Sequence, residues 1–272
     1  MATKPLRLLT ERDREILSAI DLVPLTVVQL QKLSETFSRP FTSERRLRER
    51  LRQLHEAGWL NRWPYATAGT GAPKYHKLTK LGFALLHGED ALPPTKRAFD
   101  PVGLLKQAHT LALADFLVHT LVAAHRLGCR VANVHRENTL KIQAGDDVLY
   151  PDGAFQIITS SEQPLNFLVE IDRSTERIRS TKDADAWERK LRTYDRWQQQ
   201  SKTRARVLIV MVNDGDRLAH VLDTAARITA NPERSLFYGV AFDSFLAESK
   251  PLTSACFRDH RGRTVALLLW CE

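Results

Sequence analysis

Apolar residues recur with helical spacing through the first third of the chain and then give way to alternation. Leu47, Leu51 and Leu54, for example, form an i, i+4, i+7 stripe that marks one face of a helix. Residues 59–63 and 74–78 instead alternate as strands do, on either side of a glycine-rich turn over 68–73. With their capping residues, these patterns predict helices over 10–23, 26–34 and 43–57, strands over 59–63 and 74–78, and a helix over 79–86.

This order of elements is that of a winged helix-turn-helix, which we expect over residues 1–90. The segment LHEAGWL…KYHKLTKLG resembles the wing region of bacterial transcription factors with this fold. Prolines at 93, 94 and 101 then indicate a linker over 91–101. The remaining residues, 102–272, are expected to form a second domain.

The second domain alternates between helical and strand-like patterns. A long helix with a broad apolar face is predicted over 103–127. It is followed by predicted strands over 130–134, 140–142, 154–158, 167–171, 206–212, 236–242 and 264–270, and by helices over 184–200 and 217–229. This order predicts a mixed sheet flanked by helices, so the expected fold class is α/β (α+β).

The positive charge of the chain is concentrated at its N-terminal end. The formal net charge is +8, and residues 1–97 contribute +7 of it, with 17 Lys and Arg against 10 Asp and Glu. Concentrated positive charge attracts polyanions such as nucleic acids. No apolar run is long enough to span a membrane, and the N-terminus has no apolar signal core. Three scattered cysteines argue against a disulfide framework, so a cytoplasmic protein without membrane partners is expected.

The helix over 43–57 is the candidate DNA-reading element. Opposite its leucine stripe it carries polar side chains that suit base edges in a major groove, namely Arg45, Arg48, Arg52 and Gln53. Arg62, Lys74 and Lys77, on the two predicted strands, would contact backbone phosphates. The alternative is a solvated helix whose arginines pair with its own glutamates.

Acidic residues gather around two neighbouring strands of the second domain. Asp152 precedes the strand over 154–158, whereas Glu170 and Asp172 end the next one and share one face of it. Antiparallel pairing would bring Asp152 and Glu170 together. Close carboxylates are stabilised by a cation, and oxygen ligands favour Mg²⁺ or Mn²⁺, which Asp152 and Glu170 would hold. Such an ion polarises a phosphate and activates water.

A Pro-Asp dipeptide followed by a strand ending in Glu-x-Asp resembles the PD-(D/E)xK phosphodiesterase core. More narrowly, YPDGAF, FLVEIDRSTER and ERKLRTYDRW resemble the plasmid replication-relaxation family, and His109 also fits that pattern. The resemblance covers nearly the whole chain. It implies a winged helix joined to a nuclease-like domain in a protein of a plasmid or mobile element.

The chain departs from the PD-(D/E)xK pattern at the position that normally holds the catalytic lysine, which is Asp172 here. Lys190 on the following helix is the expected replacement, and Lys182 is a less favoured one. The catalytic set under this hypothesis is Asp152, Glu170, Asp172 and Lys190. Two alternatives stay open: a degenerate site in a domain that only binds DNA, or an ion-pair network that joins Glu170, Asp172, Arg173 and Glu176 to Lys190.

The function expected from these features is binding of double-stranded DNA, with metal-dependent nicking or cleavage if the second domain is active. The first alternative is a non-catalytic accessory factor of replication, transfer or transposition, whose second domain dimerises or recruits partner proteins. The second alternative is a protein-interaction module that never contacts DNA. A homodimer and contacts with plasmid replication or transfer proteins are compatible with the sequence.

Overall fold

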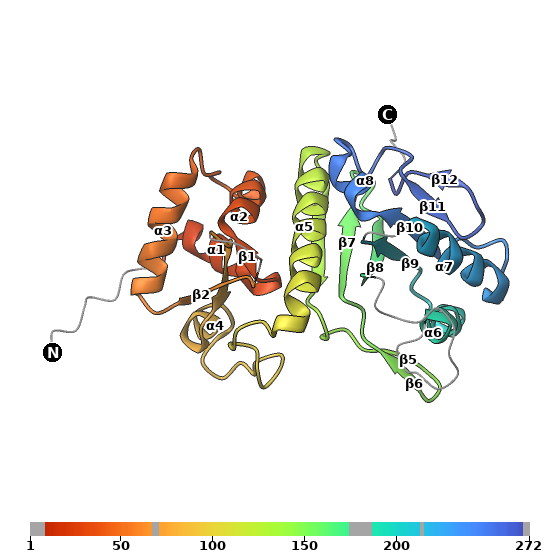
Figure 1. Ribbon diagram of the computed structural model, residues 1–272, viewed down its shortest axis with the longest axis horizontal. Coiled ribbons are helices and arrows are strands. Elements are labelled where there is room, and N and C mark those ends of the chain that lie inside the picture. The colour runs from red at the N-terminus through yellow and green to blue at the C-terminus, as the bar shows by residue number, and fades with distance from the viewer. Residues whose placement is uncertain (1–8, 67–70, 174–186, 213–214, 269–272) are drawn as a thin grey trace. The chain divides into compact units, whose positions relative to one another are not determined.

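The computed structural model describes residues 9–66, 71–173, 187–212 and 215–268 (Figure 1). The fold is of the mixed α/β class, as predicted. The chain divides into two compact units, residues 1–118 and 119–272, and the division falls within helix α5 (Leu104–Arg126). The domain limits expected from the sequence stay predictions.

The first unit contains the predicted elements in the predicted order. They are α1 (Glu11–Leu22), α2 (Val27–Leu33), α3 (Glu44–Glu56), β2 (Leu60–Pro64), β3 (Lys74–Leu78) and α4 (Lys80–His87). The short strand β1 (Leu25–Thr26) and the 3₁₀ turn η1 (Ser34–Thr36) were not predicted. The strands form an antiparallel sheet in the order β1-β3-β2, so β2 and β3 make a hairpin. Residues 68–70 of the predicted glycine-rich turn lie outside the described residues.

Local capping and one buried ion pair hold α1 and α3 in place. The Thr10 hydroxyl accepts a hydrogen bond from the Asp13 amide, and the Asp13 carboxylate accepts one from the Thr10 amide, which satisfies the first turn of α1. The same carboxylate is fully buried and accepts a hydrogen bond from Arg50 Nε of α3 at 2.5 Å. On the other face of α3, Leu47, Leu51 and Leu54 are buried, as their spacing predicts.

The second unit is built on a seven-stranded mixed sheet. Its strands are β4 (Arg130–His135), β7 (Gly153–Ile158), β8 (Pro164–Asp172), β9 (Ala205–Met211), β10 (Phe237–Ala241), β11 (Phe257–Asp259) and β12 (Thr264–Val265). They are ordered β12-β11-β10-β9-β8-β7-β4. Strands β8, β9 and β10 run parallel, whereas the other neighbours pair antiparallel.

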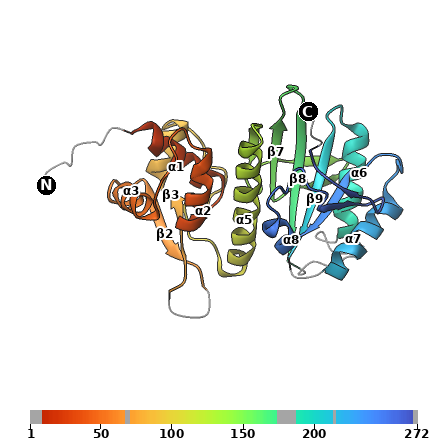
Figure 2. The same ribbon diagram turned by 90° about the horizontal axis from the view of Figure 1, so that it is seen from above.

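Helices α6 (Trp187–Gln200) and α7 (Gly215–Ile228) lie together on one face of this sheet (Figure 2). Their apolar sides bury Leu191 and Val221 against strand residues such as Val207. A separate hairpin, β5 (Ile142–Ala144) and β6 (Asp147–Leu149), adds Ile142 to the same core. Packing in this core therefore holds α6 against the end of β8, where Glu170 and Asp172 lie.

Some elements differ from the sequence prediction. The strand expected over 236–242 ends at Ala241, because Phe242 begins the short helix α8 (Phe242–Ala247), and β6 and β11 were not predicted. Of the strand expected over 264–270, residues 264–265 form β12, and residues 269–270 lie outside the described residues. The broad apolar face predicted for α5 is not buried in the first turn of the helix, where Leu104 and Leu105 are 73% and 95% exposed. Within the described residues, no helix has the length and apolar character needed to cross a membrane.

Candidate nucleic-acid interface and carboxylate cluster

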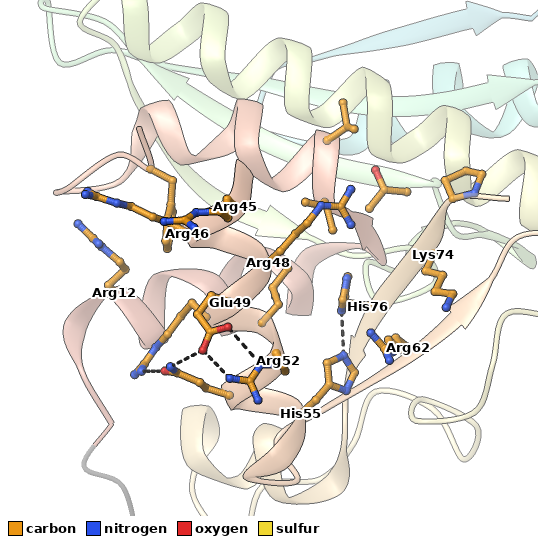
Figure 3. Close-up of a pocket in the computed structure, with 18 of the residues that line it drawn as sticks. Arg12, Arg45, Arg46, Arg48, Glu49, Arg52, His55, Arg62, Lys74 and His76 are labelled. Carbon is orange, nitrogen blue, oxygen red and sulfur yellow. Dashed lines mark hydrogen bonds and ion pairs between the residues drawn. The ribbon is translucent and has the colours of Figure 1, made fainter. Parts of the chain in front are cut away.

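A surface hollow of about 1430 Å³ lies in the first unit between α3 and the hairpin β2–β3 (Figure 3). We call it the basic hollow, because most of its charged lining residues are cationic. These cationic residues are Arg12, Arg39, Arg45, Arg46, Arg48, Arg50, Arg52, Arg62 and Lys74. Six of the seven side chains expected to contact DNA line this one hollow, which are Arg45, Arg48, Arg52, Gln53, Arg62 and Lys74.

Two of the arginines expected to read bases are paired within α3. Arg48 bonds to Glu44 through its Nε at 2.5 Å, and Arg52 bonds to Glu49 at 2.6 Å and to Glu56 at 2.5 Å. All of these groups are exposed, so each ion pair contributes at most about 1 kcal/mol and exchanges readily for another partner. The pairing expected for a solvated charged helix is therefore present, but it does not prevent these arginines from contacting a ligand.

Glu49 also determines where Gln53 points. The Gln53 amide nitrogen donates to Glu49 Oε1 at 3.1 Å, while its amide oxygen accepts from Arg50 at 2.6 Å. Arg52 and Gln53 thus share one carboxylate, as Figure 3 shows for Arg52. Glu49 was not singled out in the sequence, although its i+3 and i+4 spacing to these residues is a recognisable signal.

Several exposed cations of the basic hollow form no ion pair with the described residues, and three of them are arginines of α3 and β2. Arg45 and Arg46 come from the first turn of α3, and Arg62 comes from β2. None of the three forms an ion pair with any residue in the described ranges. The sequence pattern did not single out Arg46, because helical spacing alone does not place it beside Arg45 at the hollow. These three arginines offer unsatisfied positive charge from two different elements.

Lys77 does not join the others. Neighbouring residues on a strand face opposite sides, and on β3 it is Lys74 and His76 that line the hollow. The Lys77 ammonium donates instead to the Asp100 carbonyl at 2.5 Å, and burial lowers its pKa. The phosphate contact expected for Lys77 is therefore not favoured by its position.

A pair of histidines forms part of the wall of the basic hollow. His55 Nε2 and His76 Nδ1 lie 3.0 Å apart, which requires that at least one ring is neutral (Figure 3). Burial lowers the pKa of His76 to about 3, and the neighbouring His55 and Arg62 contribute to that lowering. Both rings are therefore neutral at pH 7 and add no charge to the hollow.

This histidine pair should make the folded state sensitive to acid. Because the pKa of His76 is depressed by folding, the unfolded chain binds the proton more readily, and stability is lost as the pH falls from about 6.5 towards 3. Between pH 7 and pH 5 the loss should be about 2 kcal/mol from this residue. Urea unfolding of the wild type and of His76→Gln at both pH values measures it. Equal losses in the two proteins would contradict this role.

The strand register of the second unit brings Asp152 and Glu170 together. Gly153 pairs with Val169 across β7 and β8, so Asp152 stands opposite Glu170 at the end of that ladder. One Asp152 oxygen accepts a hydrogen bond from the Ile171 amide at 2.7 Å. A carboxylate oxygen of Glu137, a residue missed in the sequence, lies within 4.8 Å of an Asp152 oxygen. We call Glu137, Asp152 and Glu170 the carboxylate cluster.

Glu170 is buried and contacts two side chains of α6. Lys190 Nζ donates to one oxygen at 3.0 Å, and the Tyr194 hydroxyl donates to the other at 2.5 Å. Lys190 and Tyr194 are one helical turn apart, which places both on the side of α6 that faces β8. Burial raises the pKa of Glu170 to about 7 against the lowering effect of Lys190, and the Asp152 carboxylate also raises it.

Asp172 is engaged in a different interaction. Its fully buried carboxylate accepts hydrogen bonds from Trp187 Nε1 at 2.6 Å and from Arg217 Nε at 2.7 Å. Asp172 shares a strand face with Glu170, as predicted, but these two hydrogen bonds tie β8 to α6 and α7. Lys182 and Glu176, which the sequence also suggested, lie outside the described residues.

The family model described as replication-relaxation matches residues 21–212, which is more than half of the chain and includes both α3 of the basic hollow and the carboxylate cluster. No curated protein and no solved structure matches the chain. The match agrees with the resemblance carried by the YPDGAF and FLVEIDRSTER segments. This chain therefore belongs to the replication-relaxation family.

Proposed function

We propose that this protein binds double-stranded DNA through the basic hollow, in a role related to the replication of a plasmid or other mobile element. Family membership indicates that role. The observation that carries DNA binding is the convergence of Arg45, Arg46 and Arg62, from α3 and from the β2–β3 hairpin, on one hollow without neutralising partners among the described residues. Guanidinium groups suit phosphate oxygens in both charge and geometry.

The arrangement has the parts that a winged helix-turn-helix uses on DNA. In this proposal α3 enters the major groove while the β2–β3 hairpin lies along the backbone. Arg45, Arg46 and Arg62 bind phosphates and set the register, since phosphate contacts carry no sequence information directly. Arg48, Arg52 and Gln53 contact base edges after exchanging their weak intrahelical partners for guanine or adenine.

The triple variant Arg45→Gln, Arg46→Gln, Arg62→Gln tests this proposal. We expect its affinity for a 20-base-pair duplex to fall roughly 100-fold at 0.1 M salt, from about 1 kcal/mol for each lost contact. The slope of log K against log salt should become shallower by about 3, because about one fewer counterion is released per contact. Fluorescence anisotropy across a salt series measures both quantities.

A matched control uses three exposed lysines of the same unit that do not line the hollow. Lys80→Gln, Lys96→Gln, Lys106→Gln removes the same charge. If this control and the triple variant weaken binding equally, the hollow has no special role, and net charge alone explains the affinity. If neither changes binding, the first unit is a protein-interaction module.

A second candidate function for the same protein is metal-dependent cleavage of DNA at the carboxylate cluster. The observation that favours it is the Lys190 ammonium 3.0 Å from Glu170, with Asp152 opposite Glu170 in the strand ladder. These contacts involve the same three residue types as the PD-(D/E)xK core, namely Asp, Glu and Lys, although the lysine comes from α6 rather than from the strand. Carboxylate oxygens, such as those of Asp152 and its acidic neighbours Glu137 and Glu170, are the donors that Mg²⁺ or Mn²⁺ prefers, and the ion would supply phosphate polarisation and an activated water.

The residues of the chain would then have distinct roles. Asp152 and Glu170 would hold the cation, and Tyr194, through its hydrogen bond, would orient Glu170. Lys190 would move its positive charge from Glu170 to the phosphate when DNA and cation are present. Burial and the Asp152 carboxylate raise the pKa of Glu170, and a bound cation would lower that pKa again by favouring the ionised carboxylate.

A further inference from the structure

The run of basic residues over 189–206 is split by the structure into paired and unpaired members. Arg189 bonds to Asp147 at 2.8 Å and Arg192 to Glu188 at 2.8 Å, and Arg196 also contacts Asp147. Lys202 and Arg204, in the turn between α6 and β9, are exposed and form no ion pair with the part of the chain that the structure describes. The run is thus not one uniform solvated face.

Lys202 and Arg204 line a second hollow, of about 510 Å³, with Arg234. Its other lining residues are polar or acidic, namely Gln198, Ser201, Asn231 and Glu233. Gln198 is buried and its amide is bonded to the Thr203 carbonyl and the Ala205 amide, which fixes the turn that carries both cations. The backbone of the turn that carries Lys202 and Arg204 is therefore held in one conformation beside the second hollow.

The acids close to the second hollow are already paired. Glu233 bonds to Arg261 at 3.1 Å, and Asp195 bonds to Arg234 at 3.2 Å. Arg234 retains a buried Nε without a hydrogen-bond partner among the described residues, which is a costly state for a charged donor. The positive charge of Lys202 and Arg204 is consequently not offset by either of these acids.

The second hollow is separate from the carboxylate cluster. Arg204 directly precedes Ala205, which pairs with Asn166 near the start of β8. Glu170 lies four residues further along the same strand, which corresponds to about 13 Å. The second hollow therefore lies near the start of β8, whereas Glu170 lies near the end of that strand.

From these features we infer that the second hollow is a phosphate-binding site for the backbone of a nucleic acid, formed by Lys202, Arg204 and Arg234. Phosphate is the anion that best matches a guanidinium fork beside an ammonium. An acidic peptide is a poorer match, because its carboxylates are spaced by side chains rather than by a regular backbone. With this site, the second unit would bind DNA independently of the basic hollow.

The test is the double variant Lys202→Gln, Arg204→Gln of the full chain, titrated with a fluorescein-labelled 40-base-pair duplex. We expect a roughly tenfold loss of affinity and a salt slope shallower by about 2. The matched control is Arg189→Gln, Arg192→Gln, which removes two cations that are already paired on α6. The control should leave the salt slope unchanged.

Several outcomes would overturn the inference. Equal changes in the two double variants would mean that only total charge matters. Equal competition by polyglutamate and by duplex DNA for the Lys202- and Arg204-dependent contacts would point to an acidic protein partner. Lower thermal stability with unchanged affinity would mean that these cations only stabilise the C-terminal end of α6.

The experiment also separates this inference from DNA binding by the first unit. In a background with Arg45, Arg46 and Arg62 replaced by Gln, the remaining affinity should depend on Lys202 and Arg204. If the Lys202 and Arg204 substitutions leave DNA affinity unchanged in every background, the phosphate site at the second hollow is refuted, but DNA binding by the basic hollow is not. If the Lys202 and Arg204 substitutions weaken DNA binding as expected, but the substitutions of Arg45, Arg46 and Arg62 do not, DNA binding by the basic hollow is refuted and the phosphate site at the second hollow is not.

Discussion

Replacing Glu170 with Gln is expected to reduce Mn²⁺-dependent nicking of supercoiled plasmid by at least roughly 1000-fold, which corresponds to about 4 kcal/mol of transition-state stabilisation. Gln keeps the size of the side chain and an acceptor for the Tyr194 hydroxyl, but it removes the charge that would hold the cation. Affinity for duplex DNA should change less than about threefold, since the basic hollow is untouched. Conversion of supercoiled to open-circular plasmid on agarose gels measures the nicking.

Two further variants make this result specific. Asp152→Asn should have a similar effect, because Asp152 faces Glu170 across the strand ladder. Glu162→Gln, which replaces an exposed acid in the turn between β7 and β8, is the matched control and should nick normally. A thermal melt of each variant checks that the second unit remains folded.

The outcome distinguishes the nuclease from a non-catalytic accessory factor. Wild-type protein that leaves plasmid topology unchanged with Mn²⁺ or Mg²⁺ would refute cleavage and favour the accessory factor. Unchanged nicking by the Glu170 variant would place the active site elsewhere. Either result leaves DNA binding by the basic hollow to be judged by its own arginine variants.

Gly82→Ala should destabilise the first unit by about 3 kcal/mol, or roughly 15 °C in Tm. A Cβ added at Gly82 would lie 2.1 Å from the Trp59 carbonyl oxygen, far inside van der Waals contact. That carbonyl cannot retreat easily, because it accepts a hydrogen bond from the Thr79 amide at 3.0 Å. Helix α4 would have to move away from the β2–β3 hairpin, and the basic hollow would change shape.

Gly103→Ala is the natural comparison. A Cβ added at Gly103, which lies just before α5, would meet no atom within 4 Å. Its replacement should change stability by less than about 0.5 kcal/mol. Calorimetry of both variants tests the prediction, and similar melting temperatures for the two would refute the close contact at Trp59.

The first unit could be predicted closely because its sequence signals are local. Ser43 caps α3 and the leucine stripe fixes its buried face, so both its limits and its exposed arginines followed from spacing. The pairing of Arg48 and Arg52 within the helix was left open, because the sequence allows each arginine several partners. Lys77 was grouped with Lys74 as a phosphate contact, although it lies three residues away on the same strand and therefore faces the opposite side.

The second unit was harder to predict because its site depends on contacts distant in sequence. The proximity of Asp152 and Glu170 followed from two adjacent antiparallel strands. The contact of Lys190 with Glu170 depends on how α6 packs on the sheet. From the sequence, Lys190 was the favoured of two lysines that could replace the lysine of the motif. Glu137 has no motif of its own, so only the folded chain places its carboxylate near Asp152.

The buried partners of Asp172 have a consequence for substitutions at this position. A lysine introduced at this position would put its ammonium beside the Arg217 guanidinium and the Trp187 indole N–H, two donors that would lose their acceptor. A single Asp172→Lys substitution should therefore destabilise the second unit. Under the nuclease proposal, the positive charge of the motif would therefore come from α6, through Lys190, while Asp172 serves as the buried acceptor that joins β8 to α6 and α7.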